Sequence, residues 1–200
     1  GMSPFSMMIA SSMVIVLLNI ALLRHGGDLA VGALGIQNSI VTLFLMFIIG
    51  LNQGIQPILG YNYGAQNYDR MFSTLTRAAL IATIVTTIGF LLSTFFSSVL
   101  VSIFTTDEEL KSISANALRI SVIMLPLVGS QIVFTSFFQS IGKAKISMLL
   151  SLARQVLFLI PAVLILPAFF GLNGVWFSMP VADSLAVVVT SITIFTFIRK

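Results

Sequence analysis

The chain has 200 residues, of which 58% are hydrophobic and only 8% are charged, and its mean hydropathy is +1.09. Because so few charged residues cannot cover the surface of a water-soluble domain, we expect a membrane protein. The net charge of +4 comes from charges scattered over loop ends, so we expect no nucleic-acid partner. The chain has no cysteine, which excludes disulfides and thiolate chemistry.

Apolar stretches long enough to cross a bilayer, about 20 residues each, recur along the chain. The last of them must divide at FFGLNG (169–174), because Arg154 and Asp183 lie within the spans on either side. Strands of a membrane barrel would alternate apolar and polar residues, and no such alternation is found. The sequence therefore predicts an all-α membrane protein, a single six-helix transmembrane bundle over 1–200. Its helices are expected at about 5–23, 33–60, 78–104, 118–139, 146–167 and 174–197.

The basic residues predict the orientation. Six helices place both ends of the chain on one side, and the loops of that side carry more lysine and arginine than the others. The two groups are Arg70, Arg77, Lys143, Lys145, Arg154, Arg199 and Lys200 against Arg24, Lys111 and Arg119. The richer side, with both termini, is expected to be cytoplasmic.

Two smaller expectations concern helix ends. In TTDEEL, Thr106 is a candidate N-cap with acidic residues in the first turn after it. Trp176, Tyr61, Tyr63 and Tyr68 lie near predicted span boundaries, where amphipathic rings settle at the membrane interface.

The second predicted helix carries three amides and a proline near its end. Asn52, Gln53 and Gln56 are spaced to share one face, which should point into the bundle or a wet cavity rather than to lipid. Two interpretations stay open: hydrogen-bonded packing between helices, or a cavity wall that a substrate contacts. Gly50 and Gly54 have the small-xxx-small spacing that permits close helix approach.

Prolines and one further glutamine mark the later helices. Gln131 is a candidate cavity-lining residue in the fourth predicted helix. Pro57, Pro126, Pro161 and Pro180 are expected to kink their helices. Broken or bendable helices are typical of transporters, although receptors and scaffolds also use them.

Arg154 and Asp183 are ionisable residues inside predicted spans. At 1.5 Å per residue they lie about 12 Å and 13 Å from opposite boundaries, so their depths in the bilayer are similar. Their helices are consecutive and antiparallel, which makes an intramembrane ion pair possible. Three interpretations stay open for Asp183 and Arg154: a structural pair, a proton- or cation-responsive site, and separate solvated roles.

Motifs of common enzyme and metal sites are absent. The sequence has no nucleophile–base constellation, no zinc spacing and no phosphate loop, and a single histidine. We therefore expect neither an enzyme, nor a metal site, nor an organic cofactor.

Four stretches together resemble one family of transporters. They are GLNQGIQPILGYNYGAQNYDR (50–70), FFQSIGKAKIS (137–147), LSLARQVLFLIP (150–161) and GLNGVWFSMPVADS (171–184). In this order they are similar to the C-terminal half of the multidrug and toxic compound extrusion (MATE) family, in its bacterial multidrug branch. The resemblance implies one six-helix lobe of a two-lobed, twelve-helix antiporter. It also implies export of amphipathic or cationic compounds in exchange for H⁺ or Na⁺, across the bacterial cytoplasmic (inner) membrane.

The resemblance also implies what this chain would need around it. Besides the lipid bilayer and small amphipathic substrates, the expected partner is a missing N-terminal lobe or a second copy of the chain. The chain is expected to be an excised or truncated lobe, with a natural half-transporter as the alternative. The matching helices 5–23 and 120–139 lack the acidic residues that some sodium-coupled relatives place there, so the coupling ion stays open.

Two other functions stay open as alternatives. One is a lipid or lipid-linked sugar flippase of the same superfamily, which a markedly cationic cavity would favour. The other is a non-transporting membrane assembly module, in which the polar residues serve helix packing alone.

Overall fold

The computed structural model describes residues 2–199, with side chains from residue 8 onward, and this part of the chain consists of helices joined by short turns, without strands. The helices are α1 (Met2–Gly64), α2 (Tyr68–Phe95), α3 (Ser97–Ser102), α4 (Glu108–Ser121), α5 (Leu125–Ser140), α6 (Ala144–Leu152), the π-helix η1 (Ala153–Leu159) and α7 (Ile160–Ile198). The predicted all-α fold class is confirmed. Lys200, one of the basic residues counted for orientation, lies outside the described residues.

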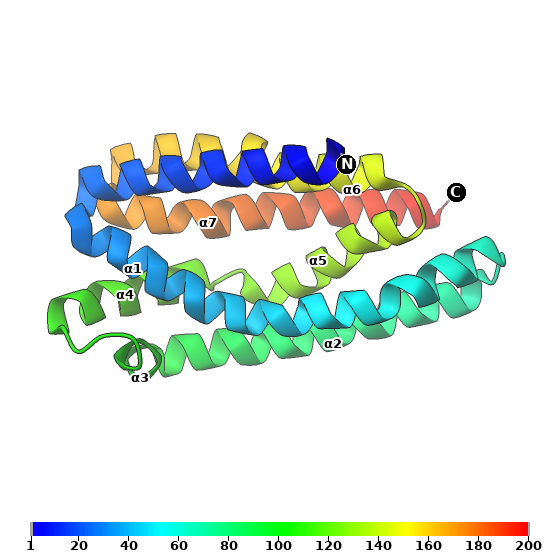
Figure 1. Cartoon of the computed structure of the whole chain (residues 1–200), viewed down its shortest axis with the longest axis horizontal. Helices are drawn as coiled ribbons and strands as arrows, with labels where there is room; N and C mark the ends of the chain where they lie inside the picture. Colours follow the sequence, from blue (N-terminus) through cyan, green and yellow to red (C-terminus); the bar gives the residue numbers. More distant parts are fainter. Residues whose placement is uncertain (1, 200) are drawn as a thin grey trace.

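Two glycines turn the longest helices back on themselves. Gly27 in α1 has φ 66° and Gly171 in α7 has φ 56°, a left-handed conformation that glycine adopts without a side-chain clash. At both points the chain reverses direction, so α1 and α7 each form two antiparallel arms (Figure 1). Gly171 lies in the segment 169–174, where the sequence predicts a break, and Gly27 lies between the predicted helices 5–23 and 33–60.

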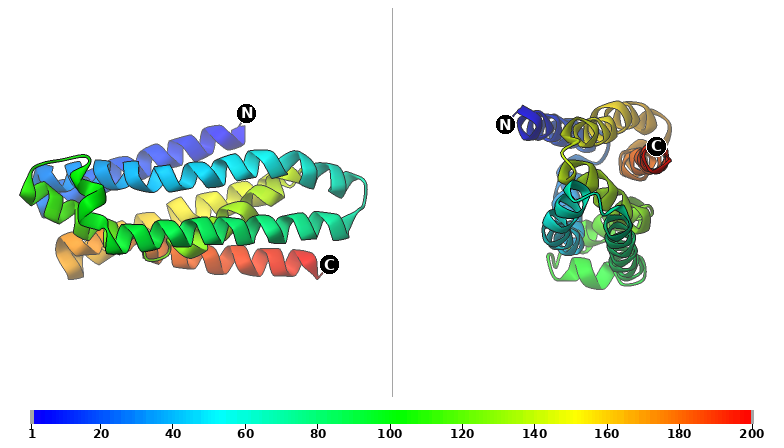
Figure 2. Two further views of the ribbon diagram at one scale, coloured as in Figure 1. Left: turned by 90° about the horizontal axis from the view of Figure 1, so that it is seen from below. Right: turned by 90° about the vertical axis from the view of Figure 1, so that its right-hand side faces the viewer.

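The described chain thus runs through the bundle in six helical passes: 2–26, 28–64, 68–95, 108–140, 144–170 and 172–198. Three stretches, Met8–Gly64, Tyr68–Phe95 and Ala144–Ile198, are long and apolar enough to cross a membrane, and α4 with α5 forms a fourth such stretch, bent by 57°. Both termini lie at one end of the bundle (Figures 1 and 2).

Large apolar side chains cover the outside of this bundle. Phe47, Phe95 and Phe169 are each more than two-thirds exposed, and many leucines and isoleucines accompany them. A soluble monomer does not expose apolar surface on this scale, so the surrounding solvent is lipid.

Close helix packing joins α2 to α5 and to the second arm of α1. A Cβ placed on Gly89 would lie 2.8 Å from the ring of Phe44, and one on Gly129 would lie 2.7 Å from the carbonyl oxygen of Ala82. Close approach at small residues is how helices associate in lipid, where burial of apolar surface offers no driving force between them. At Gly50 and Gly54, by contrast, no atom lies within 4 Å of such a Cβ, so the predicted close approach there does not occur within the described chain.

The third pass differs most from its predicted range. Helix α2 begins at Tyr68 and ends at Phe95, whereas the sequence predicted 78–104. Asn67 caps its start by accepting a hydrogen bond from the Arg70 amide, so the helix includes a charged segment outside the apolar run. Beyond Phe95, the short helix α3 follows, and its Ser97 accepts a hydrogen bond from Arg119 Nε at 2.7 Å.

Two further expectations about helix ends were wrong. The N-cap of α4 is Asp107, whose Oδ1 accepts from the Leu110 amide at 2.9 Å, and not Thr106. Trp176 lies fully buried in the cluster between α1, α4 and α7 rather than at the membrane interface. The turn at Gly171 explains its burial, because it brings this part of α7 back against the bundle.

The four prolines have different structural consequences. Pro126 lies in the first turn of α5, directly after the bend from α4, and Pro161 lies in the first turn of α7, directly after the π-helix η1. A π-helical turn relieves the clash between a proline ring and the carbonyl four residues before it. At Pro57 and Pro180 the helices continue without a break, and the strong reversals of α1 and α7 occur at glycines instead.

Candidate functional site

Two cavities of about 260 Å³ and about 270 Å³ lie within the bundle, and Arg154 and Gln155 line both of them. The first is lined by residues of the second arm of α1, the ends of α4 and α5, η1 and α7. The second is lined by α5, α6 and η1. Because Arg154 and Gln155 of the π-helix contribute to both linings, the two cavities border each other at η1.

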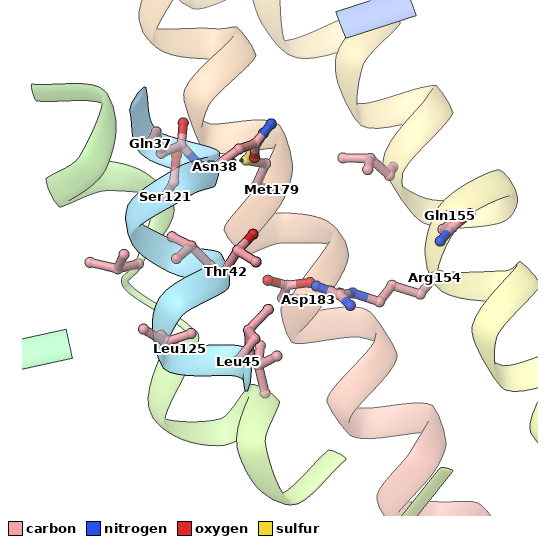
Figure 3. A pocket seen from close by; sticks show the side chains of 14 residues that line it. Gln37, Asn38, Thr42, Leu45, Ser121, Leu125, Arg154, Gln155, Met179 and Asp183 are labelled. Atoms are coloured by element: carbon pink, nitrogen blue, oxygen red, sulfur yellow. Dashed lines mark hydrogen bonds and ion pairs between the residues drawn. The ribbon is translucent and has the colours of Figure 1, made fainter. Parts of the chain in front are cut away.

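Arg154 and Asp183 meet at this boundary. Arg154 Nε donates a hydrogen bond to Asp183 Oδ1 at 2.6 Å, and Figure 3 shows the two side chains pointing toward one another from η1 and α7. The Asp183 side chain is 12% exposed and that of Arg154 is 36% exposed, so the carboxylate is the more enclosed partner. A carboxylate in so apolar a bundle is stable as an ion only with such a partner.

Polar residues surround the pair in the first cavity. Gln37, Asn38 and Thr42 face it from α1, and Ser121 lies at the end of α4 (Figure 3). Gln37 Nε2 lies 3.3 Å from Met179 Sδ, whereas Gln37 Oε1 and Ser121 Oγ have no hydrogen-bond partner among the described residues. Buried polar atoms in native proteins are paired with protein, water or ligand, so these two atoms point to a hydrated or ligand-binding cavity.

The second cavity has a similar lining. Its wall consists mainly of amides and hydroxyls from α5 and α6: Gln131, Thr135, Ser136, Gln139, Ser147 and Ser151. Gln131 is 5% exposed, and its Oε1 has no partner among the described residues. Across η1, Gln155 Oε1 accepts a hydrogen bond from Ser11 Oγ at 3.0 Å, which fixes this side chain against the first arm of α1.

The structure divides the sequence-predicted candidates into two sets. Gln131, Arg154 and Asp183 lie together around the two cavities. The three amides of the second predicted helix, Asn52, Gln53 and Gln56, line neither cavity.

Those three amides also do not share one environment. Asn52 is 6% exposed with an unpartnered Oδ1, whereas Gln53 is exposed and Gln56 is half-buried. Within this chain only Asn52 is buried, because adjacent positions on a helix differ by about 100° in direction, and a cavity-facing role of Gln53 and Gln56 stays a prediction.

The sequence reasoning missed most of the first cavity. Gln37, Asn38 and Thr42 lie in a span that was treated only as apolar. The available signal was the pair of adjacent amides inside that span, since amides in lipid-spanning helices face the bundle interior. The part of the chain that the structure describes contains no group of three or more histidine, aspartate or glutamate side chains placed to hold a metal ion.

The family model MatE matches residues 4–164, most of the chain. The chain belongs to the MatE family. Members of this family are transporters and not enzymes, as the sequence predicted.

Several relatives of this MatE chain are named as multidrug export proteins. The multidrug export protein MepA of Staphylococcus aureus (strain MSSA476) is 26% identical over 195 residues, which cover 98% of this chain and 43% of MepA. MepA of Staphylococcus haemolyticus (strain JCSC1435) is 24% identical and covers 92% of this chain. This MatE chain therefore spans less than half the length of the curated relatives that it matches.

Solved structures share the fold. The MATE multidrug transporter DinF-BH has a TM-score of 0.85 and 39% identity over 98% of this chain and 44% of its own. A multidrug resistance MATE family transporter of the MOP superfamily, solved in an inward-facing conformation, has a TM-score of 0.88 over 95% of this chain and 44% of its own, at 22% identity. The resemblance to one lobe of a MATE transporter, which the sequence motifs indicated, is confirmed.

Proposed function

We propose that this chain is one lobe of a secondary multidrug exporter, which moves amphipathic or cationic compounds out of the cell in exchange for H⁺ or Na⁺. The observation that carries the proposal is the Arg154–Asp183 pair, which lies between two polar cavities inside an otherwise apolar bundle. Ionisable residues inside a membrane are costly, and they mark ion or substrate pathways. Family membership and the names of the MepA relatives support the same function.

Alternating access would use the breaks in the helices. The bend between α4 and α5 and the π-helix η1 both border the cavities, so small rotations at these points would change the access to Arg154 and Asp183. Asp183 is the candidate for ion exchange, because the other acidic residues of the described chain lie near helix starts and turns. Gln37, Gln131 and Met179, which line the two cavities, would contact substrates loosely, as suits a site for many compounds.

A working exporter would need a second lobe. The relatives are more than twice as long as the part of them that this chain matches, so the partner is an N-terminal lobe of a longer polypeptide or a second copy of this chain. Both termini would lie in the cytoplasm, because the loops at that end carry most of the lysine and arginine. The membrane would be the bacterial inner membrane.

Dye efflux from liposomes tests the proposal. Vesicles that contain this chain with its second lobe, either a second copy of the chain or a matching N-terminal lobe, are expected to move a cationic dye when a proton gradient or a sodium gradient is imposed. The effective gradient identifies the coupling ion. Empty liposomes and vesicles with dissipated gradients are the controls. The exporter proposal would be contradicted if the inserted, folded chain moves no dye either alone or after a matching N-terminal lobe is added. That result would favour an assembly module.

A further inference from the structure

A third cavity lies at the end of the bundle that carries both termini, away from the Arg154–Asp183 pair. Its volume is about 460 Å³, larger than either cavity at Arg154. The lining residues come from the α1–α2 turn, the α5–α6 turn and the end of α7: Tyr63, Tyr68, Met71, Phe72, Lys143, Phe197 and Ile198. The three segments meet at this end of the molecule (Figure 1).

Packed aromatic rings form one wall of this end cavity. The Tyr63 and Tyr68 rings meet edge to face at 6.1 Å, and Phe197 packs edge to face on Phe137 at 5.7 Å. Phe137 is fully buried, so this wall is anchored in the core of the bundle. Tyr68 is 48% exposed, so this wall is accessible from outside the bundle.

The lining of the end cavity includes one basic residue and, within the described chain, no acidic residue. Lys143 Nζ lies 4.2 Å from the centroid of the Phe197 ring. Between residues 2 and 199, no carboxylate lies within salt-bridge distance of this ammonium group, and no acidic residue lines the cavity. Asp69 follows Tyr68 in the sequence but is not one of the lining residues. The cavity therefore combines an apolar aromatic wall with a positive charge that no carboxylate of the described chain neutralises.

We propose that this cavity binds an anionic phospholipid, with its phosphate at Lys143 and its first acyl carbons along the aromatic wall. A small inorganic anion would leave the apolar wall uncovered, and a cationic drug would be repelled by Lys143. Basic pockets at the cytoplasmic ends of membrane helices bind anionic head groups. Tyrosine rings suit this depth, because their apolar bodies and polar hydroxyls fit the boundary between lipid and water.

Lipid binding to matched variants tests this site. The chain is placed in detergent, and binding of phosphatidylglycerol and phosphatidylcholine is followed by native mass spectrometry. The unmodified chain is expected to prefer phosphatidylglycerol. In Lys143→Gln this preference should fall about fivefold, the effect of one basic residue at a membrane surface. Lys143→Arg should keep the preference, because it retains the positive charge.

The control is Lys145→Gln, which removes an equal charge from an exposed residue in the first turn of α6 that does not line the cavity. Equal losses in Lys143→Gln and Lys145→Gln would overturn the site, because they would show an effect of net charge alone. Absence of a preference for phosphatidylglycerol would also overturn it. Inorganic phosphate that displaces the lipid completely at millimolar concentration would show a site for a free anion instead. None of these readouts depends on transport, so the exporter proposal stands or falls separately.

Discussion

Asp183→Asn is expected to destabilise the lobe by about 3 kcal/mol, because it leaves the Arg154 guanidinium without its anionic partner inside the bundle. This value is at the lower end for a broken buried pair, since Arg154 keeps 36% of its side chain exposed. The same variant should abolish gradient-driven dye movement, because the proposed ion-exchanging carboxylate is gone. Unfolding in detergent, followed by circular dichroism, measures the first effect, and liposome efflux measures the second.

Asp28→Asn is the matched control, since Asp28 is exposed next to the Gly27 turn. It should change stability by less than about 1 kcal/mol, the range for a charge near a helix start. Equal unfolding curves for the chain with and without Asp183→Asn would show that the pair contributes nothing to the fold.

A double variant separates the structural role of the pair from its role in transport. Arg154→Met with Asp183→Leu removes both charges and keeps similar volumes, so stability should return to near that of the unmodified chain. Efflux should not return. A double variant that transports as well as the unmodified chain would reduce the pair to helix packing and contradict the exporter mechanism.

Gly174→Ala is the second substitution with a large expected effect. A Cβ at this position would overlap the backbone carbonyl of Leu166 in the preceding arm of α7. Because a backbone atom cannot rotate away as a side chain can, we expect a loss of about 3 kcal/mol, the upper part of the overpacking range. The two arms would separate near the Gly171 turn, and Asp183 would shift relative to Arg154. Thermal unfolding and efflux of this variant are the measurements.

Gly54→Ala provides the comparison for Gly174→Ala. A Cβ on Gly54 would meet no atom within 4 Å, so the helix propensity of alanine should stabilise α1 by up to about 1 kcal/mol. Similar losses in the two variants would show that the close return of α7 is not the cause. A loss at Gly54 alone would point to a contact with a second lobe at that position.

Several features of this protein could be predicted from single residues. Apolar length predicted a helical membrane bundle, and the similar depths of Arg154 and Asp183 made their pairing geometrically possible. Those inferences depend on one large free-energy cost, that of placing a charge or an unpaired backbone group in lipid. The same cost marks the turns at Gly27 and 169–174, where apolar runs stop.

The sequence by itself thus determined the solvent, the fold class and the depth of the charged residues, whereas the tertiary structure decided which residues face the cavities. In lipid both the inner and the outer face of a helix are apolar, so periodicity does not distinguish them as it does in water. For this reason Gln37 and Asn38 were missed, Trp176 was placed at the interface, and the different burial of Asn52 and Gln53 in this chain was not foreseen. Those positions depend on the glycine contacts, the π-helix and the bend before α5, which set how each helix is rotated against its neighbours.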